Sequence, residues 1–183
     1  MFEQVGMTTR QNPLVNSGKA SATDVLILAL GNPLRGDDGV GLQVLEALKR
    51  CEDLPEGITL LGGDEYDLMA ALMTGKYRRV VIVDAADFGG TPGKWTRLTM
   101  NGIGYAGVKS RGTLHNISIT EVLSLSEALK ITLPEIVVYG VQPLNVMWSP
   151  ALSEPVEKAV EKVCETIFKE CLLNQPQSSG ERM

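Results

Sequence analysis

The feature that most constrains the fold is an apolar run that leads through a glycine-rich turn into a helical pattern. Residues 25–30 are all apolar, which is typical of a strand buried on both faces of a parallel sheet. The turn Gly31 to Gly41 follows, and helical spacing then appears at Val40, Val44, Leu45 and Leu48. A strand, turn and helix in this order place the turn at the carboxyl end of the strand, where open α/β sheets form their binding crevice.

The turn carries two adjacent carboxylates, Asp37 and Asp38, and three interpretations of them are open. In the structural interpretation, an aspartate at a helix start accepts a backbone hydrogen bond and stabilises the helix by about 1 kcal/mol. One aspartate suffices for that, so in the functional interpretation Asp37 caps the helix while Asp38 projects into the crevice as a metal ligand or base. In the third, the turn binds a phosphate through backbone N–H groups. Two carboxylates would repel a phosphate, and no lysine follows the last glycine, so neither nucleotide-binding fingerprint fits.

Composition narrows the class of protein. The 183 residues are 44% hydrophobic and 21% charged, as expected for one compact globular domain. The net charge of -5, with no basic cluster beyond Arg78 and Arg79, argues against a nucleic-acid partner. No apolar run approaches the roughly 20 residues needed to cross a bilayer, and residues 1–21 lack the apolar core of a signal peptide. We therefore expect a cytoplasmic protein with no membrane insertion.

The three cysteines show neither a zinc-site spacing nor a disulfide framework. Cys164 and Cys171 lie on one predicted helix, about 10 Å apart, which exceeds the roughly 7 Å limit for a disulfide. We expect them to be buried apolar residues, whereas Cys51 stands alone near a helix end.

The rest of the chain alternates between strand and helix patterns. Apolar runs predict strands at residues 58–61, 80–83 and 136–141, and alternation predicts an edge strand at residues 94–100. Helical patterns occupy residues 64–74, residues 118–130 and a long stretch after Ser153. This order predicts a three-layer α/β/α sandwich with a mostly parallel central sheet of about five strands, in a single domain at residues 24–173. We expect residues 1–23 to be a flexible extension and residues 174–183 a polar tail.

Two further side chains can reach the predicted crevice. Asp84 follows the apolar run 80–83, and a buried carboxylate there must be satisfied either by backbone N–H groups of a neighbouring loop or by a functional partner. His115, the only histidine, precedes a helix in a connecting segment, where functional side chains concentrate. Together with Asp38 they provide two carboxylates and one imidazole, a set suited to nickel or zinc. Nucleophilic catalysis fits poorly, because no serine or cysteine is evidently placed beside His115.

Four motifs carry a resemblance to a known family. They are GNPLRGDDGVG at Gly31–Gly41, VIVDAADFGGTPG at Val81–Gly93, the segment Leu114–Asn116 and YGVQP at Tyr139–Pro143. In these motifs the chain resembles the hydrogenase maturation endopeptidases, most closely the branch that processes hydrogenase 3-type enzymes. The resemblance extends from Asp24 to Leu172. It departs from the family at Leu61, where family members often have aspartate before two glycines.

By this resemblance Asp38, Asp84 and His115 match the metal-contacting, catalytic residues of the family. The resemblance implies an endopeptidase that removes the C-terminal extension from the nickel-loaded large-subunit precursor of a nickel-iron hydrogenase. Nickel would then be supplied by the substrate, and cadmium or zinc would substitute for it in crystals. The metal would mark the substrate, while a role in polarising the scissile carbonyl or activating a water is left open.

Two other functions are also compatible with these residues. One is a non-catalytic α/β module that binds a small anionic ligand or nucleotide at the Gly31–Gly41 turn, with Asp38 dispensable. The other is a different metal-assisted hydrolase of the same architecture.

Overall fold

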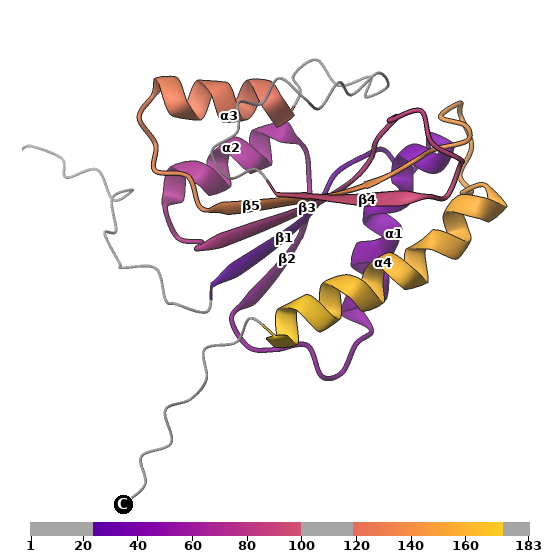
Figure 1. The fold of residues 1–183 in the computed structure, drawn as a ribbon, viewed down its shortest axis with the longest axis horizontal. Helices are drawn as coiled ribbons and strands as arrows, with labels where there is room; N and C mark the ends of the chain where they lie inside the picture. The colour runs from indigo at the N-terminus through magenta and orange to yellow at the C-terminus, as the bar shows by residue number, and fades with distance from the viewer. Residues whose placement is uncertain (1–23, 100–118, 174–183) are drawn as a thin grey trace, which may run out of the picture.

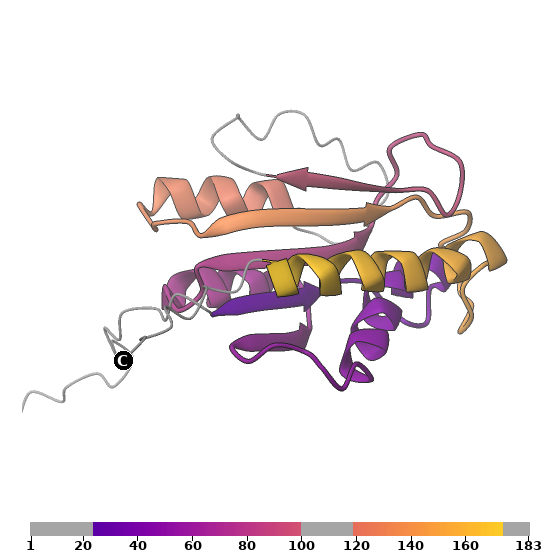
Figure 2. The ribbon, with the colours of Figure 1, turned by 60° about the horizontal axis from the view of Figure 1, so that its bottom comes forward.

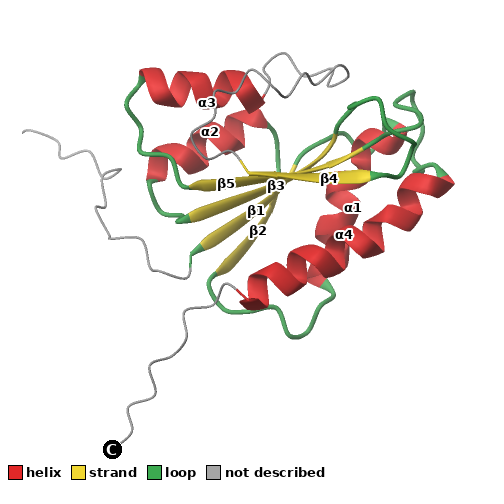
Figure 3. Cartoon of the chain, viewed as in Figure 1, coloured by secondary structure: helices red, strands yellow, loops and turns green. Residues whose placement is uncertain are grey.

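The structure is a computed structural model that describes residues 24–99 and 119–173. Its strands are β1 (Val25–Ala29), β2 (Ile58–Gly62), β3 (Arg79–Ala85), β4 (Trp95–Thr99) and β5 (Glu135–Val141). Its helices are the 3-10 turn η1 (Gly36–Gly39) and the α-helices α1 (Val40–Lys49), α2 (Glu65–Thr74), α3 (Ile119–Ala128) and α4 (Glu154–Leu173). Helices cover both faces of one sheet, so the predicted three-layer α/β/α sandwich is confirmed (Figures 1 and 3).

The five strands lie in the order β2-β1-β3-β5-β4, and only β4 runs antiparallel to its neighbour. Figure 2 shows the arrowheads of β1, β3 and β5 at one edge of the sheet and the arrowhead of β4 pointing the other way. The central strands β1 and β3 are apolar throughout most of their length because both of their faces are buried. Four strands therefore end at the same edge, with η1 directly after β1.

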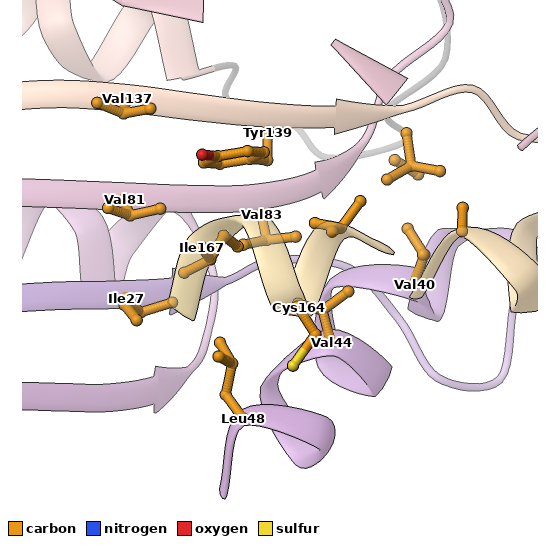
Figure 4. Close-up of a cluster of buried hydrophobic side chains, with 14 of the residues drawn as sticks. Ile27, Val40, Val44, Leu48, Val81, Val83, Val137, Tyr139, Cys164 and Ile167 are labelled. Carbon is orange, nitrogen blue, oxygen red and sulfur yellow. The ribbon is translucent and has the colours of Figure 1, made fainter. Parts of the chain in front are cut away.

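Each face of the sheet packs against its own pair of helices. α1 and α4 cover one face and enclose the core cluster drawn in Figure 4, which includes Ile27, Val83 and Tyr139. α2 and α3 cover the other face, where Leu28, Leu68 and Leu123 are buried. Successive residues of a strand enter the two cores in turn, because neighbouring side chains of a strand point to opposite faces of the sheet.

Several sequence-based predictions concern residues outside the described part of the chain. The flexible extension at residues 1–23, the polar tail at residues 174–183 and His115 all lie there. Among the described residues, no helix is both long enough and apolar enough to cross a membrane.

Candidate functional site

The backbone of the glycine-rich turn packs directly onto the ends of β1 and β3. Gly31 has a φ of +114°, and a Cβ there would lie 1.9 Å from the carbonyl oxygen of Asp38. Gly41, in the first turn of α1, approaches so closely that a Cβ would lie 2.4 Å from the Val83 oxygen and 2.5 Å from the Leu30 oxygen. Only glycine permits these approaches. They bring the acidic turn against the end of β3, which carries Asp84.

Asp38 is buried in this turn, with 4% of its surface exposed. Its Oδ2 accepts a hydrogen bond of 2.9 Å from the backbone N–H of Asn32, at the start of the turn. This bond fixes the carboxylate beside the carboxyl edge of the sheet. Asp38 therefore lies at the carboxyl edge of the sheet, and its role as a metal ligand or catalytic residue stays a prediction.

Asp84 is also buried, and one of its oxygens is unsatisfied. It is 5% exposed. The strand β3 extends two residues beyond the predicted range 80–83, so Asp84 lies within the strand and pairs with Gly140 of β5. No hydrogen-bond donor among the described residues reaches Oδ1 of Asp84. A buried carboxylate oxygen without a donor is costly, so this position favours a proton or a cation.

The electrostatics of Asp84 point the same way. Burial, and next the nearby Asp38 carboxylate, raise the pKa of Asp84 to about 8, while a backbone hydrogen bond from Ala85 opposes the shift. The charge of Glu65 adds to the increase in the pKa. Two carboxylates that share a buried site resist ionising together, and a divalent cation would relieve this repulsion.

Sequence reasoning missed Glu65 as a member of this acidic group. It is the first residue of α2 and only 5% exposed, although acidic residues at helix starts are usually solvated. Its position after Gly62-Gly63, at the same carboxyl edge as the Gly31–Gly41 turn, was the available signal.

The prediction that Asp37 caps the helix is wrong. The N-cap residue of α1 is Gly39, which has no side chain to cap the helix, and Asp37 lies two residues earlier, inside the 3-10 turn η1. Asp37 is fully buried and instead accepts four hydrogen bonds from distant residues. The donors are the backbone N–H groups of Leu144, Asn145 and Ser153, at 2.8, 2.9 and 2.6 Å, and the Ser153 hydroxyl at 2.8 Å. Asp37 therefore holds the loop 144–153 and the start of α4 against the turn.

Gln142 organises the loop that follows Asp84, a role that the sequence motif did not reveal. Its Oε1 accepts hydrogen bonds from the backbone N–H groups of Phe88 and Gly90, at 2.9 and 3.0 Å. Its Nε2 donates to Oδ1 of Asp87 at 3.0 Å. The glutamine side chain is buried and thus fixes the loop 87–90 beside the end of β3. The available signal in the sequence was the place of Gln142 directly after the apolar run 136–141 and before Pro143.

The structure brings two of the three predicted site residues together. Asp38 and Asp84 interact at the carboxyl edge of the sheet, whereas His115 lies outside the described residues. Within residues 24–99 and 119–173, no three His, Cys, Asp or Glu side chains are grouped closely enough to hold a metal ion. The complete triad therefore stays a prediction.

Comparison with known proteins identifies the family. A protein-family model described as hydrogenase maturation protease matches residues 42–170. The chain belongs to the hydrogenase maturation protease family. The matched range contains Asp84 and His115 but begins after Asp38, so the interpretation of Asp38 depends on the motif and on the geometry above.

Similar proteins and solved structures agree with this family. The hydrogenase 3 maturation protease of Escherichia coli K12 is 31% identical over an alignment of 149 residues that covers 79% of this chain and 88% of that protein. A hydrogenase expression/formation protein of Rhizobium leguminosarum is 28% identical over an alignment of 154 residues that covers 83% of this chain and 76% of that protein.

Two solved structures share the fold. The hydrogenase maturating endopeptidase HybD of Escherichia coli has a TM-score of 0.70 at 22% identity and covers 82% of this chain and 93% of its own. The nickel-iron hydrogenase maturation protease HycI of Thermococcus kodakarensis has a TM-score of 0.64 at 26% identity, with the same shares covered. This protein is therefore a peptidase of the family that matures hydrogenases.

Proposed function

We propose that this hydrogenase maturation protease removes the C-terminal extension of the nickel-loaded large-subunit precursor of a nickel-iron hydrogenase, in the hydrogenase 3-type branch. The observation that carries the proposal is the unsatisfied Oδ1 of Asp84, which is buried beside Asp38. A peptidase that recognised only a peptide sequence would not need a buried carboxylate oxygen without a hydrogen-bond donor. A nickel ion carried by the substrate would supply the missing positive charge.

The chemistry of the donor set supports a metal that arrives with the substrate. Asp38, Asp84 and His115 would contribute two carboxylates and one imidazole, which suits a divalent transition metal. All three groups must be deprotonated to bind it, and Asp84, whose pKa is raised to about 8, keeps its proton at neutral pH. The site on its own should thus hold free metal weakly. It would be completed when the nickel-loaded precursor displaces that proton.

The surface next to the site suits a protein substrate. Leu34, in the glycine-rich turn, and Leu144, Met147 and Trp148, in the loop that Asp37 holds, are all more than half exposed. The two loops are joined by a hydrogen bond of 2.9 Å from the Ser149 N–H to the Leu34 oxygen. Large apolar side chains gathered on adjoining loops are typical of surfaces that bind other proteins.

The alternative of an anion-binding module is not favoured by the turn itself. A phosphate would need free backbone N–H groups, but those of Arg35, Gly36, Asp37 and Asp38 all donate to backbone oxygens. The N–H of Asn32 donates to Asp38, and that of Leu34 donates to the side-chain oxygen of Asn32. The turn is therefore closed by internal bonds and lined by carboxylates.

The test is a processing assay on a hydrogenase large-subunit precursor that retains its C-terminal extension, prepared with and without nickel. The wild-type protein should shorten the nickel-loaded precursor and leave the nickel-free precursor intact, as read by the mass of the precursor. Asp38→Asn and Asp84→Asn should both lose processing. Asp53→Asn, at an exposed position, is the matched control and should keep full activity.

Equal shortening of both precursors by the wild type would contradict the role of nickel as the recognition element. Full activity of both Asp38→Asn and Asp84→Asn would contradict the site. Resistance of the reaction to serine and cysteine protease inhibitors is expected, because neither residue type is assigned to the chemistry.

A further inference from the structure

A pocket lies between α1 and α4. Its volume is about 610 Å³, and the segment Pro150–Leu152 also lines it. Residues of both helices line it, including Ala47, Arg50, Cys51, Cys164 and Phe168. Cys51 follows the C-terminal end of α1, so the length of this ten-residue helix, about 15 Å, separates it from the acidic turn. The pocket is thus a second feature of the fold that the proposed reaction does not use.

The pocket contains two cysteines from facing helices. Cys51, which was expected to stand alone, lines the same pocket as Cys164 and packs against the core cluster that contains it. The Cys51 thiol also donates a hydrogen bond of 3.6 Å to the Ala47 oxygen. Figure 4 shows the Cys164 sulfur pointing from α4 toward α1, beside Val44. Both cysteines are free thiols.

We propose that Cys51 and Cys164 form a reversible disulfide that cross-links α1 to α4 when the protein is exposed to a peroxide. The Cys51 sulfur attacks the peroxide, which gives a sulfenic acid at Cys51 and releases one water. The Cys164 sulfur then displaces the sulfenic hydroxyl, which forms the S–S bond and releases a second water. The two thiols lose two electrons in total, and these reduce hydrogen peroxide to two molecules of water.

The surroundings assign the order of these two steps. Cys51 is partly exposed, whereas Cys164 is 8% exposed. Burial, and next the contact with Cys51, raise the pKa of Cys164 to about 11, although the Arg50 charge opposes this. A buried thiol that holds its proton is a poor first nucleophile. Cys164 is instead placed to resolve a sulfenic acid that forms next to it.

The third cysteine lies outside this pair. Cys171 is buried two helical turns along α4 from Cys164, a distance of about 10 Å along the helix axis. It does not line the pocket. Cys171 therefore serves as an internal control, because its oxidation reports on a cysteine outside the pocket.

The experiment treats the full-length protein with increasing hydrogen peroxide, quenches it, and digests it with trypsin without reductant. Cleavage after Arg50, Lys162 and Lys169 places the three cysteines in three different peptides. The expected product is a single linked pair of peptides that contain Cys51 and Cys164, in a monomer that has lost about 2 Da. A thiol reductant should return both peptides to the unlinked form, and the oxidised protein should unfold at a higher temperature than the reduced protein.

Matched variants locate the bond. Cys51→Ser and Cys164→Ser should each abolish the linked pair, while Cys171→Ser should form it as the wild type does. The proposal is overturned if folded wild-type protein takes up oxygen at Cys51 without forming the linked pair. It is equally overturned if the bond involves Cys171 or joins two chains. Because the decisive readout is the wild type, a variant that fails to fold leaves the result intact.

Discussion

At the scale of single residues, the adjacent aspartates Asp37 and Asp38 have different roles, because their side chains bond to different parts of the chain. Asp38 bonds locally, to the start of its own turn, and presents its charge to Asp84. The Asp37 side chain accepts hydrogen bonds from Leu144, Asn145 and Ser153, which are more than 100 residues away. A local capping rule cannot distinguish them, because the identity of the Asp37 donors depends on where the chain returns. The sequence could therefore indicate that the pair has two roles but could not assign the role of Asp37.

Replacing Asp37 should cost much more stability than the loss of a helix cap would. Asp37→Ala leaves four donors without their acceptor in a buried position, and removing one partner of such a buried charged network costs on the order of 3 to 5 kcal/mol. The free energy of unfolding from denaturant titration measures this. Asp53→Ala, at an exposed position, should change it by less than about 0.5 kcal/mol. A loss near 1 kcal/mol for Asp37→Ala would mean that the anchoring bonds contribute little.

The raised pKa of Asp84 should make stability fall as pH rises. The ordinary pKa of this side chain is 3.8, and the folded protein raises it to about 8, so between these values the folded state holds a proton that the unfolded state has lost. Stability from this proton is complete below pH 3.8 and is lost as pH rises to 8, with a limiting slope of about 1.4 kcal/mol per pH unit.

The measurement is the difference in unfolding free energy between the wild type and Asp84→Asn from pH 5 to 9, because the amide of the variant does not titrate. The wild type should lose stability relative to the variant up to about pH 8 and run parallel to it above that. Parallel curves over the whole range would show that the Asp84 carboxyl group titrates normally.

At the scale of elements, close backbone packing places the acidic turn. Gly41→Ala would push a Cβ into the backbone oxygens of Val83 and Leu30, which have no room to yield. We expect a loss of several kcal/mol in unfolding free energy and a loss of processing, because α1 would be displaced from β3. Gly62→Ala is the control, since its Cβ would meet only the ends of flexible Leu42 and Leu45 side chains. Equal effects of the two variants would contradict the packing argument.

The elements themselves were largely predictable from the sequence. Each of the five strands lies within two residues of the predicted range. For the central strands β1, β3 and β5 the reason is an apolar run buried on both faces, which leaves a strong pattern, whereas the edge strand β4 was indicated by alternation. The order β2-β1-β3-β5-β4 was not predicted, since it depends on which way each connection crosses the sheet. The shared pocket of Cys51 and Cys164 was missed for the same reason, because only the fold brings α1 and α4 together.

At the scale of the whole molecule, the exposed apolar loops beside the site should determine how well the precursor binds. Trp148 is 75% exposed, so Trp148→Ala should leave the unfolding free energy within about 0.5 kcal/mol. The KM for the precursor should rise by on the order of tenfold, since large aromatic side chains dominate protein interfaces. Leu173→Ala is the control, because Leu173 is 83% exposed at the other end of α4. Steady-state processing kinetics measure both, and an unchanged KM for Trp148→Ala would place the docking surface elsewhere.

The bonds between Asp37 and Ser153 also determine when the acidic turn can fold during synthesis of the chain. The two residues are 116 positions apart, so the turn that carries Asp38 is made early but cannot be tied down until the start of α4 has left the ribosome. Until then the Asp37 carboxylate lacks the two hydrogen bonds that Ser153 donates, and α1 lacks α4, the helix that packs beside it. A nascent chain that lacks Ser153 and α4 should consequently be unable to cut, and activity should begin only after both have been made.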